Sequence, residues 1–175
     1  MKIGIALGSN LGDRMANLRA ARQAIVNVVG DKNLLASGVY ETEPIECEAG
    51  AGKFLNAVLE VDYDGDPTQL LDQMIQIEES LGRKRGHASP ASLGYAAASN
   101  VSRKIDIDLL YADDISVQNE HLQLPHPRMH RRRFVLQPLA DVRPELILPG
   151  QKKPVRELLA ELKDSATVTR FAESW

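Results

Sequence analysis

Lys104-Ile105-Asp106-Ile107-Asp108-Leu109-Leu110 carries the strongest strand pattern in the chain, within a predicted strand over residues 104–112. Apolar residues alternate with polar ones, which is the period of a strand with one buried face. Asp106 and Asp108 therefore point to the same side of the strand, while the isoleucines and Leu109 point into the core.

The two aspartates of this strand are a candidate metal site. Like charges at neighbouring positions on one face repel, so they need a cation or one of them must keep its proton. Mg²⁺ takes few protein ligands and completes its shell with water and phosphate oxygens, which suits carboxylates two residues apart. Two solvated acids on an exposed sheet face are the alternative interpretation.

On either side of this strand, apolar periodicity predicts further elements. Asp66 and Pro67 are the N-cap and first residue of an amphipathic helix that ends at Gly82. Strands are predicted over 3–7, 34–42, 54–63 and 115–118, and helices over 14–29, 131–142 and 154–163. The order β-α-β-β-α-β with short links predicts an α+β fold, a ferredoxin-like sandwich on a mainly antiparallel sheet.

The composition bounds the class of protein. The chain has 175 residues, 43% hydrophobic and 26% charged, with a net charge of −3, so we expect a single domain over 1–175. The single cysteine, Cys47, excludes an internal disulfide and a thiolate metal cluster, and a reducing, cytoplasmic location fits it. No apolar run approaches the ~18 residues of a membrane helix. The acidic balance is atypical of a nucleic-acid-binding surface.

Cationic side chains are concentrated near the predicted metal strand. Arg83 and Arg85 precede a long Gly/Ala/Ser-rich stretch, and Arg103 stands three residues before Asp106. A second group follows further along the chain: His126, Arg128, His130, Arg131, Arg132 and Arg133. Arginine suits multidentate phosphate contacts, and acids for a metal combined with arginines for phosphates are typical of phosphoryl transfer. For Arg128, Arg131 and Arg133 a solvated face is the alternative.

Six segments, in this order, resemble the 6-hydroxymethyl-7,8-dihydropterin pyrophosphokinase family. They are Ala6-Leu7-Gly8-Ser9-Asn10-Leu11-Gly12-Asp13-Arg14, Tyr40-Glu41-Thr42-Glu43-Pro44, Phe54-Leu55-Asn56-Ala57-Val58, Ile77-Glu78 through Arg85, Arg103 through Leu110, and Pro125-His126-Pro127-Arg128-Met129 through Leu139. The resemblance implies an α/β/α sandwich that transfers pyrophosphate from ATP to the hydroxymethyl group of the pterin in folate biosynthesis and releases AMP. It also implies a monomer that acts on small molecules.

The resemblance assigns roles to individual residues. Asp106 and Asp108 hold two Mg²⁺ ions, with ATP as co-substrate. The arginines in catalysis are Arg83, Arg85 and Arg103, and the ATP contacts are Arg85, His126 and Arg132. The pterin pocket is formed by Thr42, Pro44, Ile45, Phe54, Asn56 and Phe134. The two phenylalanines stack on the pterin ring, Asn56 recognises its amide edge, and Thr42 contributes its backbone.

The sequence departs from the family before the metal strand. Many members have Trp-Gly-Pro-Arg where this chain has Asn100-Val101-Ser102-Arg103, and residues 86–102 contain no Asp, Glu, Lys or Arg. We expect 86–102 to be a lid that closes over both substrates. Two alternatives remain open at this point. One is a paralogue of the same fold acting on a different pterin alcohol, and the other is a ferredoxin-like RNA-binding module that uses residues 128–133.

Overall fold

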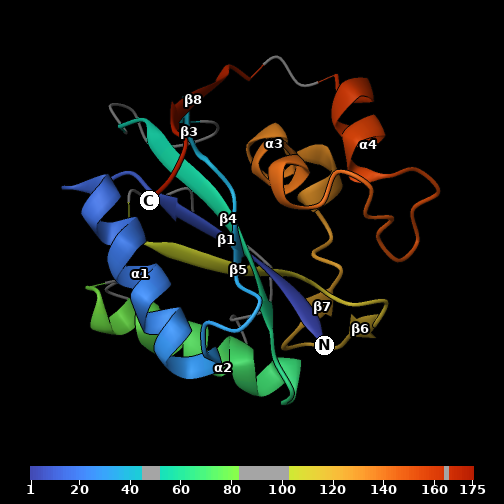
Figure 1. The fold of residues 1–175 in the computed structure, drawn as a ribbon, viewed down its shortest axis with the longest axis horizontal. Coiled ribbons are helices and arrows are strands. Elements are labelled where there is room, and N and C mark those ends of the chain that lie inside the picture. The colour runs from blue at the N-terminus through green and yellow to red at the C-terminus, as the bar shows by residue number, and fades with distance from the viewer. Residues whose placement is uncertain (45–51, 83–102, 164–165) are drawn as a thin grey trace.

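The fold is built on one antiparallel sheet. The computed structural model describes residues 1–44, 52–82, 103–163 and 166–175. The strands lie in the order β5-β1-β4-β3-β8, with β2 also paired to β4, and every pairing is antiparallel (Figure 1). Their bounds are β1 (Lys2–Ser9), β2 (Leu35–Ala36), β3 (Val39–Thr42), β4 (Phe54–Asp62), β5 (Asp106–Ala112) and β8 (Val168–Ala172).

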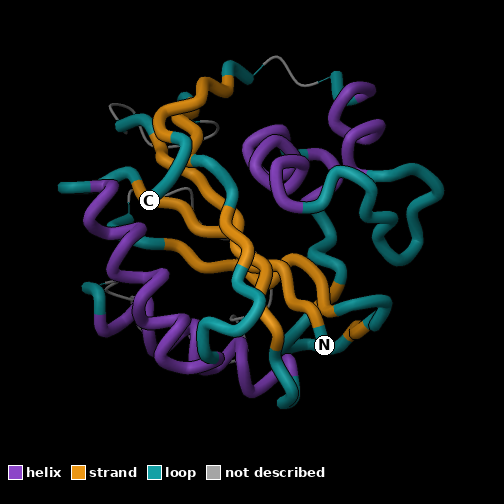
Figure 2. Tube along the Cα trace, viewed as in Figure 1, coloured by secondary structure: helices purple, strands orange, loops and turns teal. Residues whose placement is uncertain are grey.

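Helices cover both faces of the sheet. Helices α1 (Arg14–Val29) and α2 (Pro67–Ser80) lie on one face, and α3 (Arg133–Val142) lies on the other with α4 (Val155–Glu161) beside it (Figures 1 and 2). This confirms the predicted ferredoxin-like sandwich, because the predicted elements pair in the order β5-β1-β4-β3. Among the described residues, no helix is long and apolar enough to cross a bilayer.

Each face of the sheet has its own apolar core. Under α1 and α2 lie the residues that the alternation pattern assigns to the core: Ile107 and Leu109 from β5, and Ile105 just before this strand. The α3 face has a second cluster, in which Val58 and Leu110 pack against Leu136. Asp106 and Asp108 are on this second face, and both are partly exposed.

Local sequence accounts for the two central helices. Asp13 and Asp66 cap α1 and α2, and their carboxylates accept hydrogen bonds from the backbone N–H groups of Ala16 at 3.0 Å and Thr68 at 2.8 Å. Gly30 ends α1 at a φ of 83°, a conformation that favours glycine. Both helices were predicted to within two residues at each end.

Some predicted elements differ in extent. The strand predicted over 34–42 is interrupted at Ser37, whose hydroxyl accepts a hydrogen bond from the backbone N–H of Val58, so β2 and β3 are separate. The helix predicted over 131–142 begins as a 3-10 turn at Met129–Arg131 before α3. The short strand near 117 pairs as β6 (Val117–Gln118) with β7 (Gln123–Leu124).

Strand β8 was not predicted, and it closes the edge of the sheet beside β3. Its residues are half-buried or exposed, so the sequence lacks the alternation that reveals a strand. The Arg170 guanidinium donates to the Tyr40 hydroxyl at 2.5 Å and lies 3.0 Å from Asp141 on α3, and Tyr40 donates to Asp141 at 2.8 Å. Burial first, and then the hydrogen bond to Asp141, raise the pKa of Tyr40 to about 12, so these contacts persist at neutral pH.

Candidate active site

The predicted site residues converge on Gly8, near the end of β1. Gly8 pairs with Asp106 on β5 and with Asn56 on β4, so the three share one row and one face of the sheet. A Cβ atom on Gly8 would lie 3.3 Å from Asn56 Oδ1, 3.9 Å from the Phe54 ring and 4.0 Å from the Asp106 Cβ. The missing side chain leaves a space that a predicted metal ligand and two predicted pterin residues border.

The aspartate pair fits a hydrated divalent cation. Asp108 stands opposite Ala6, and Asp106 opposite Gly8, so small residues leave room beside both carboxylates. Among the described residues, no cluster of three or more His, Cys, Asp or Glu side chains could hold a metal. Two hard oxygen donors with open space beside them therefore suit an ion that takes its other ligands from water and phosphates.

Arg103 is held against the aspartates. Its guanidinium lies 2.6 Å from Asp106 Oδ1, and its side chain is 13% exposed. Burial lowers the pKa of Arg103, but the charge and hydrogen bond of Asp106, with the charges of Asp108 and Glu78, leave that pKa above its ordinary value. Arg103 is therefore a fixed cation beside the predicted metal ligands.

The turn after β1 anchors the backbone that carries Arg103. The backbone N–H of Arg103 donates to Asn10 Oδ1 at 2.7 Å, and the Arg103 carbonyl accepts from the backbone N–H of Asn10 at 3.2 Å. Ser9 Oγ donates to the Lys104 carbonyl at 2.5 Å. The sequence analysis assigned no role to Ser9 or Asn10, although both belong to the first family segment, Ala6 through Arg14.

His126 is a neutral, buried imidazole at this site. It is 2% exposed, its backbone N–H donates to the Leu110 carbonyl at 2.8 Å, and its Nδ1 accepts from the backbone N–H of Arg128 at 3.1 Å. Burial, and then the charges of Arg132 and Arg128, lower the pKa of His126 to about 3, while Asp106 opposes that shift. Because Nδ1 accepts, the single proton is on Nε2, which makes this nitrogen a donor.

Phe134 lies in the first turn of α3, beside the cation of Arg132. The Arg132 guanidinium lies over the Phe134 ring, 5.4 Å from its centroid, and Phe134 also packs against the apolar cluster of the α3 face. Phe134 is half-buried, as is Phe54 at the start of β4. The stacking of both rings on a pterin stays a prediction.

Asn56 and Thr42 form a buried polar pair. Asn56 Nδ2 donates to Thr42 Oγ1 at 2.8 Å, and the side chains are on neighbouring strands β4 and β3. This contact directs the amide nitrogen toward Thr42 and leaves Oδ1 at the space over Gly8. The Thr42 side chain thus orients Asn56, a role that the sequence interpretation did not assign. Pro44 follows β3 and is half-buried.

Several predicted residues lie outside the described part of the chain. They are Ile45, Arg83, Arg85 and the predicted lid over 86–102. Their roles stay predictions.

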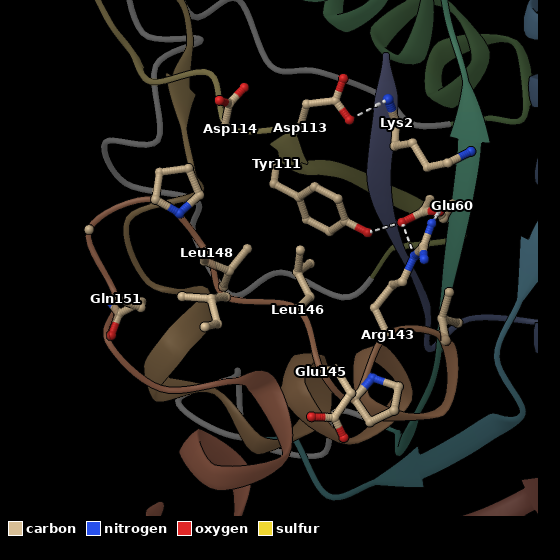
Figure 3. A pocket seen from close by; sticks show the side chains of 15 residues that line it. Lys2, Glu60, Tyr111, Asp113, Asp114, Arg143, Glu145, Leu146, Leu148 and Gln151 are labelled. Atoms are coloured by element: carbon tan, nitrogen blue, oxygen red, sulfur yellow. Dashed lines mark hydrogen bonds and ion pairs between the residues drawn. The ribbon is translucent and has the colours of Figure 1, made fainter.

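A separate cavity lies at the other end of the same strands. It has a volume of about 920 Å³ and is lined by Lys2 at the start of β1, with Glu60, Tyr111 and Arg143 at one wall (Figure 3). Tyr111 donates to Glu60 Oε2 at 2.6 Å, and Arg143 binds the same carboxylate at 2.5 and 2.8 Å. No described residue of the predicted site lines this cavity, so its size alone does not locate the chemistry.

Comparison with known proteins identifies the family. The family model for 7,8-dihydro-6-hydroxymethylpterin-pyrophosphokinase (HPPK) matches residues 4–144. The chain belongs to the HPPK family. The match spans every described residue of the predicted site and ends before α4 and β8.

Relatives of similar length carry the same name. Proteins named 2-amino-4-hydroxy-6-hydroxymethyldihydropteridine pyrophosphokinase include one from Methylorubrum extorquens, 35% identical over 92% of this chain and 93% of the relative. Another from Bacillus subtilis is 38% identical over 79% of this chain and 75% of the relative. A third from Mycobacterium tuberculosis is 34% identical over 99% of this chain and 92% of the relative.

Solved structures share the HPPK fold. A crystal structure of HPPK-DHPS in complex with substrates has a TM-score of 0.64 and 13% identity, covering 91% of this chain and 42% of that one. Wild-type HPPK-DHPS from Plasmodium falciparum has a TM-score of 0.61 and 14% identity, covering 91% and 44%. This chain spans less than half the length of those two-part chains, and the likeness to them concerns the fold.

Proposed function

We propose that this chain transfers a pyrophosphoryl group from ATP to the hydroxymethyl oxygen of 6-hydroxymethyl-7,8-dihydropterin, in folate biosynthesis. The observation that best supports this proposal is that Asp106, Gly8 and Asn56 lie side by side on three neighbouring strands. It puts a candidate metal ligand and a candidate pterin-recognition residue on either side of one unfilled space. We further propose, as the resemblance implies, that the active unit is a monomeric, cytoplasmic single domain over 1–175.

Asp106 and Asp108 would hold two Mg²⁺ ions, whose chemistry is to screen the triphosphate and lower the pKa of the accepting hydroxyl. Around them, Arg103 supplies a positive charge that Asp106 fixes at 2.6 Å. Arg132 and His126 would add ATP contacts, and Arg83 and Arg85 are the further phosphate contacts that the resemblance implies. These groups bind and orient the phosphates, which is the main protein contribution to phosphoryl transfer.

The pterin would lie over Gly8. A pterin presents two flat ring faces and an edge of donors and acceptors. Asn56 Oδ1 faces this space and can accept from the pterin edge, while Phe54 borders the same space. Phe134, Thr42, Pro44 and Ile45 complete the proposed pocket.

The chemical step is a displacement at the β-phosphorus of ATP. The hydroxymethyl oxygen forms a bond to this phosphorus, and the bond to the oxygen bridging toward the α-phosphorus breaks. AMP leaves, and the hydroxyl proton is released to water. Arg103 and the other phosphate-binding side chains would hold the two reacting groups in line, and the aspartates would contribute by holding Mg²⁺.

An assay for AMP tests this proposal. The protein with ATP, Mg²⁺ and 6-hydroxymethyl-7,8-dihydropterin is expected to release AMP and no ADP. AMP release with a different pterin alcohol only would indicate the paralogue, and no AMP with any pterin alcohol alongside tight RNA binding would indicate the binding module. Either result would contradict the proposed substrate.

A further inference from the structure

Glu78 is a buried carboxylate on α2 beside the candidate metal strand. It is 2% exposed and follows Met74 by one helical turn, within the apolar stripe of that helix. An ionised carboxylate is unfavourable at such a position unless hydrogen bonds compensate for its lost hydration. Its partners therefore indicate what it is there to hold.

The carboxylate of Glu78 binds the backbone between the two aspartates. Its Oε1 accepts from the backbone N–H of Ile107 at 2.7 Å. Among the described strands, β5 is at the edge of the sheet beside β1, and the Ile107 N–H binds Glu78 and not a strand. Glu78 thus takes the place that a further strand would occupy, at the residue that separates Asp106 from Asp108.

Glu78 also acts on the cation of the site. Its charge, with those of Asp106 and Asp108, favours the protonated form of Arg103. A hydrogen bond to an ionised acceptor is shorter and stronger than one to a neutral acceptor, so a charged residue fixes the strand more firmly than an amide.

We propose that Glu78 is a positioning residue for the metal pair, because its carboxylate fixes the backbone of β5 at Ile107 and with it the direction of both aspartates. This inference rests on the proposed function, which makes Asp106 and Asp108 metal ligands. Glu78 does not touch the metal or the substrates in this proposal. Glu78 would affect the metal only by orienting its ligands, and removal of such a residue typically lowers metal affinity about 10- to 100-fold.

The test compares Glu78→Ala and Glu78→Gln with Glu79→Gln, which changes the exposed neighbouring glutamate. Two readouts do not depend on turnover. The first is the affinity for Mn²⁺ with a non-hydrolysable ATP analogue, measured by electron paramagnetic resonance. The second is the hydrogen-exchange rate of the Ile107 amide, measured by NMR.

Glu78→Ala is expected to weaken Mn²⁺ binding about 10-fold or more, to accelerate exchange at Ile107 and to leave pterin affinity within about twofold. Glu78→Gln is expected to fall between this variant and wild type, since its amide oxygen still accepts the hydrogen bond. Glu79→Gln is expected to match wild type. If Glu78→Ala does not fold, weakened Mn²⁺ binding in Glu78→Gln supports the proposal.

Unchanged Mn²⁺ affinity in the folded Glu78 variants, with faster exchange at Ile107, would overturn the proposal and leave a structural hydrogen bond only. Equal losses of Mn²⁺ and pterin affinity would overturn it as well, because they indicate general loosening. Failure of the proposed function is distinguishable from these outcomes, because it appears as absent AMP release in wild type, whereas the binding comparison needs no turnover.

Discussion

Asn56 Nδ2 donates a 2.8 Å hydrogen bond to Thr42 Oγ1, and this contact sets which end of the Asn56 amide faces the space over Gly8. Asn56→Ala is therefore expected to weaken pterin binding by about 1–3 kcal/mol, because it leaves buried polar groups without partners. ATP binding should stay nearly unchanged. Calorimetric titration with each ligand measures both effects.

Thr42→Ser is the matched control for Asn56, because serine keeps the oxygen that accepts from Nδ2. It should retain most of the pterin affinity. Equal losses for pterin and ATP in Asn56→Ala would point to a folding defect and contradict the recognition role.

A side chain at Gly8 is expected to interfere with pterin binding. The methyl group of Gly8→Ala would occupy the space between Asn56 and Asp106, with its closest contact at 3.3 Å. We expect this variant to fold and to lose about 1–3 kcal/mol of pterin affinity from overpacking of the occupied site. Thermal unfolding and pterin titration separate the two quantities, and unchanged pterin affinity would place the ligand elsewhere.

Replacing either aspartate should stop turnover, but the two replacements should change the stability of the protein differently. Asp106→Asn and Asp108→Asn are each expected to abolish AMP release. Asp106→Asn also removes the charge that lies 2.6 Å from the guanidinium of Arg103, whereas Asp108→Asn relieves repulsion with Asp106. The free energy of unfolding should therefore be lower in Asp106→Asn than in Asp108→Asn by about 1 kcal/mol or more, because the ion pair is mostly buried. Chemical denaturation without metal measures this difference, and the reverse order would contradict the pairing.

His126 should make stability depend on pH. Its pKa is lowered to about 3 in the folded chain, against an ordinary value of 6.5. Between these values the unfolded chain binds the extra proton, so the stability from the neutral imidazole is lost as pH falls from about 6.5 toward 3. The free energy of unfolding should lose up to about 1.4 kcal/mol per pH unit from this residue. His126→Asn is expected to flatten the profile between pH 7 and 5, and an unchanged slope would show that the imidazole titrates normally.

The sequence predicts those parts of the fold whose residues face one core. Strand β5 and helices α1 and α2 have alternating or helical apolar stripes with clear caps, so their positions follow from local pattern. Strand β8 has no such stripe. It is held by pairing with β3 and by the contacts of Arg170 with Tyr40 of that strand and with Asp141, and these residues are distant in the chain. Ser37 likewise interrupts the strand predicted over 34–42 through a contact with Val58 that local pattern does not contain.

In the candidate site, too, local sequence indicates some features, whereas others depend on contacts between distant segments. The side-chain types of Asp106, Asp108 and Asn56 and their motifs predict which residues take part. The contacts that hold them, Asn10 on the Arg103 backbone and Glu78 on the Ile107 backbone, join segments far apart in sequence. One local signal was present for Glu78, since it is a charged residue within the apolar stripe of α2.

The central claim is that the β- and γ-phosphates of ATP pass together to the pterin through the site that Asp106 and Asp108 build. Phosphorus NMR of the reaction products tests it most directly, with wild type and Asp108→Asn run in parallel on ATP, Mg²⁺ and 6-hydroxymethyl-7,8-dihydropterin. The predicted result is a pterin diphosphate formed in equal amount with AMP by wild type, and neither product with Asp108→Asn. A pterin monophosphate with ADP, or full turnover by Asp108→Asn, would contradict the claim.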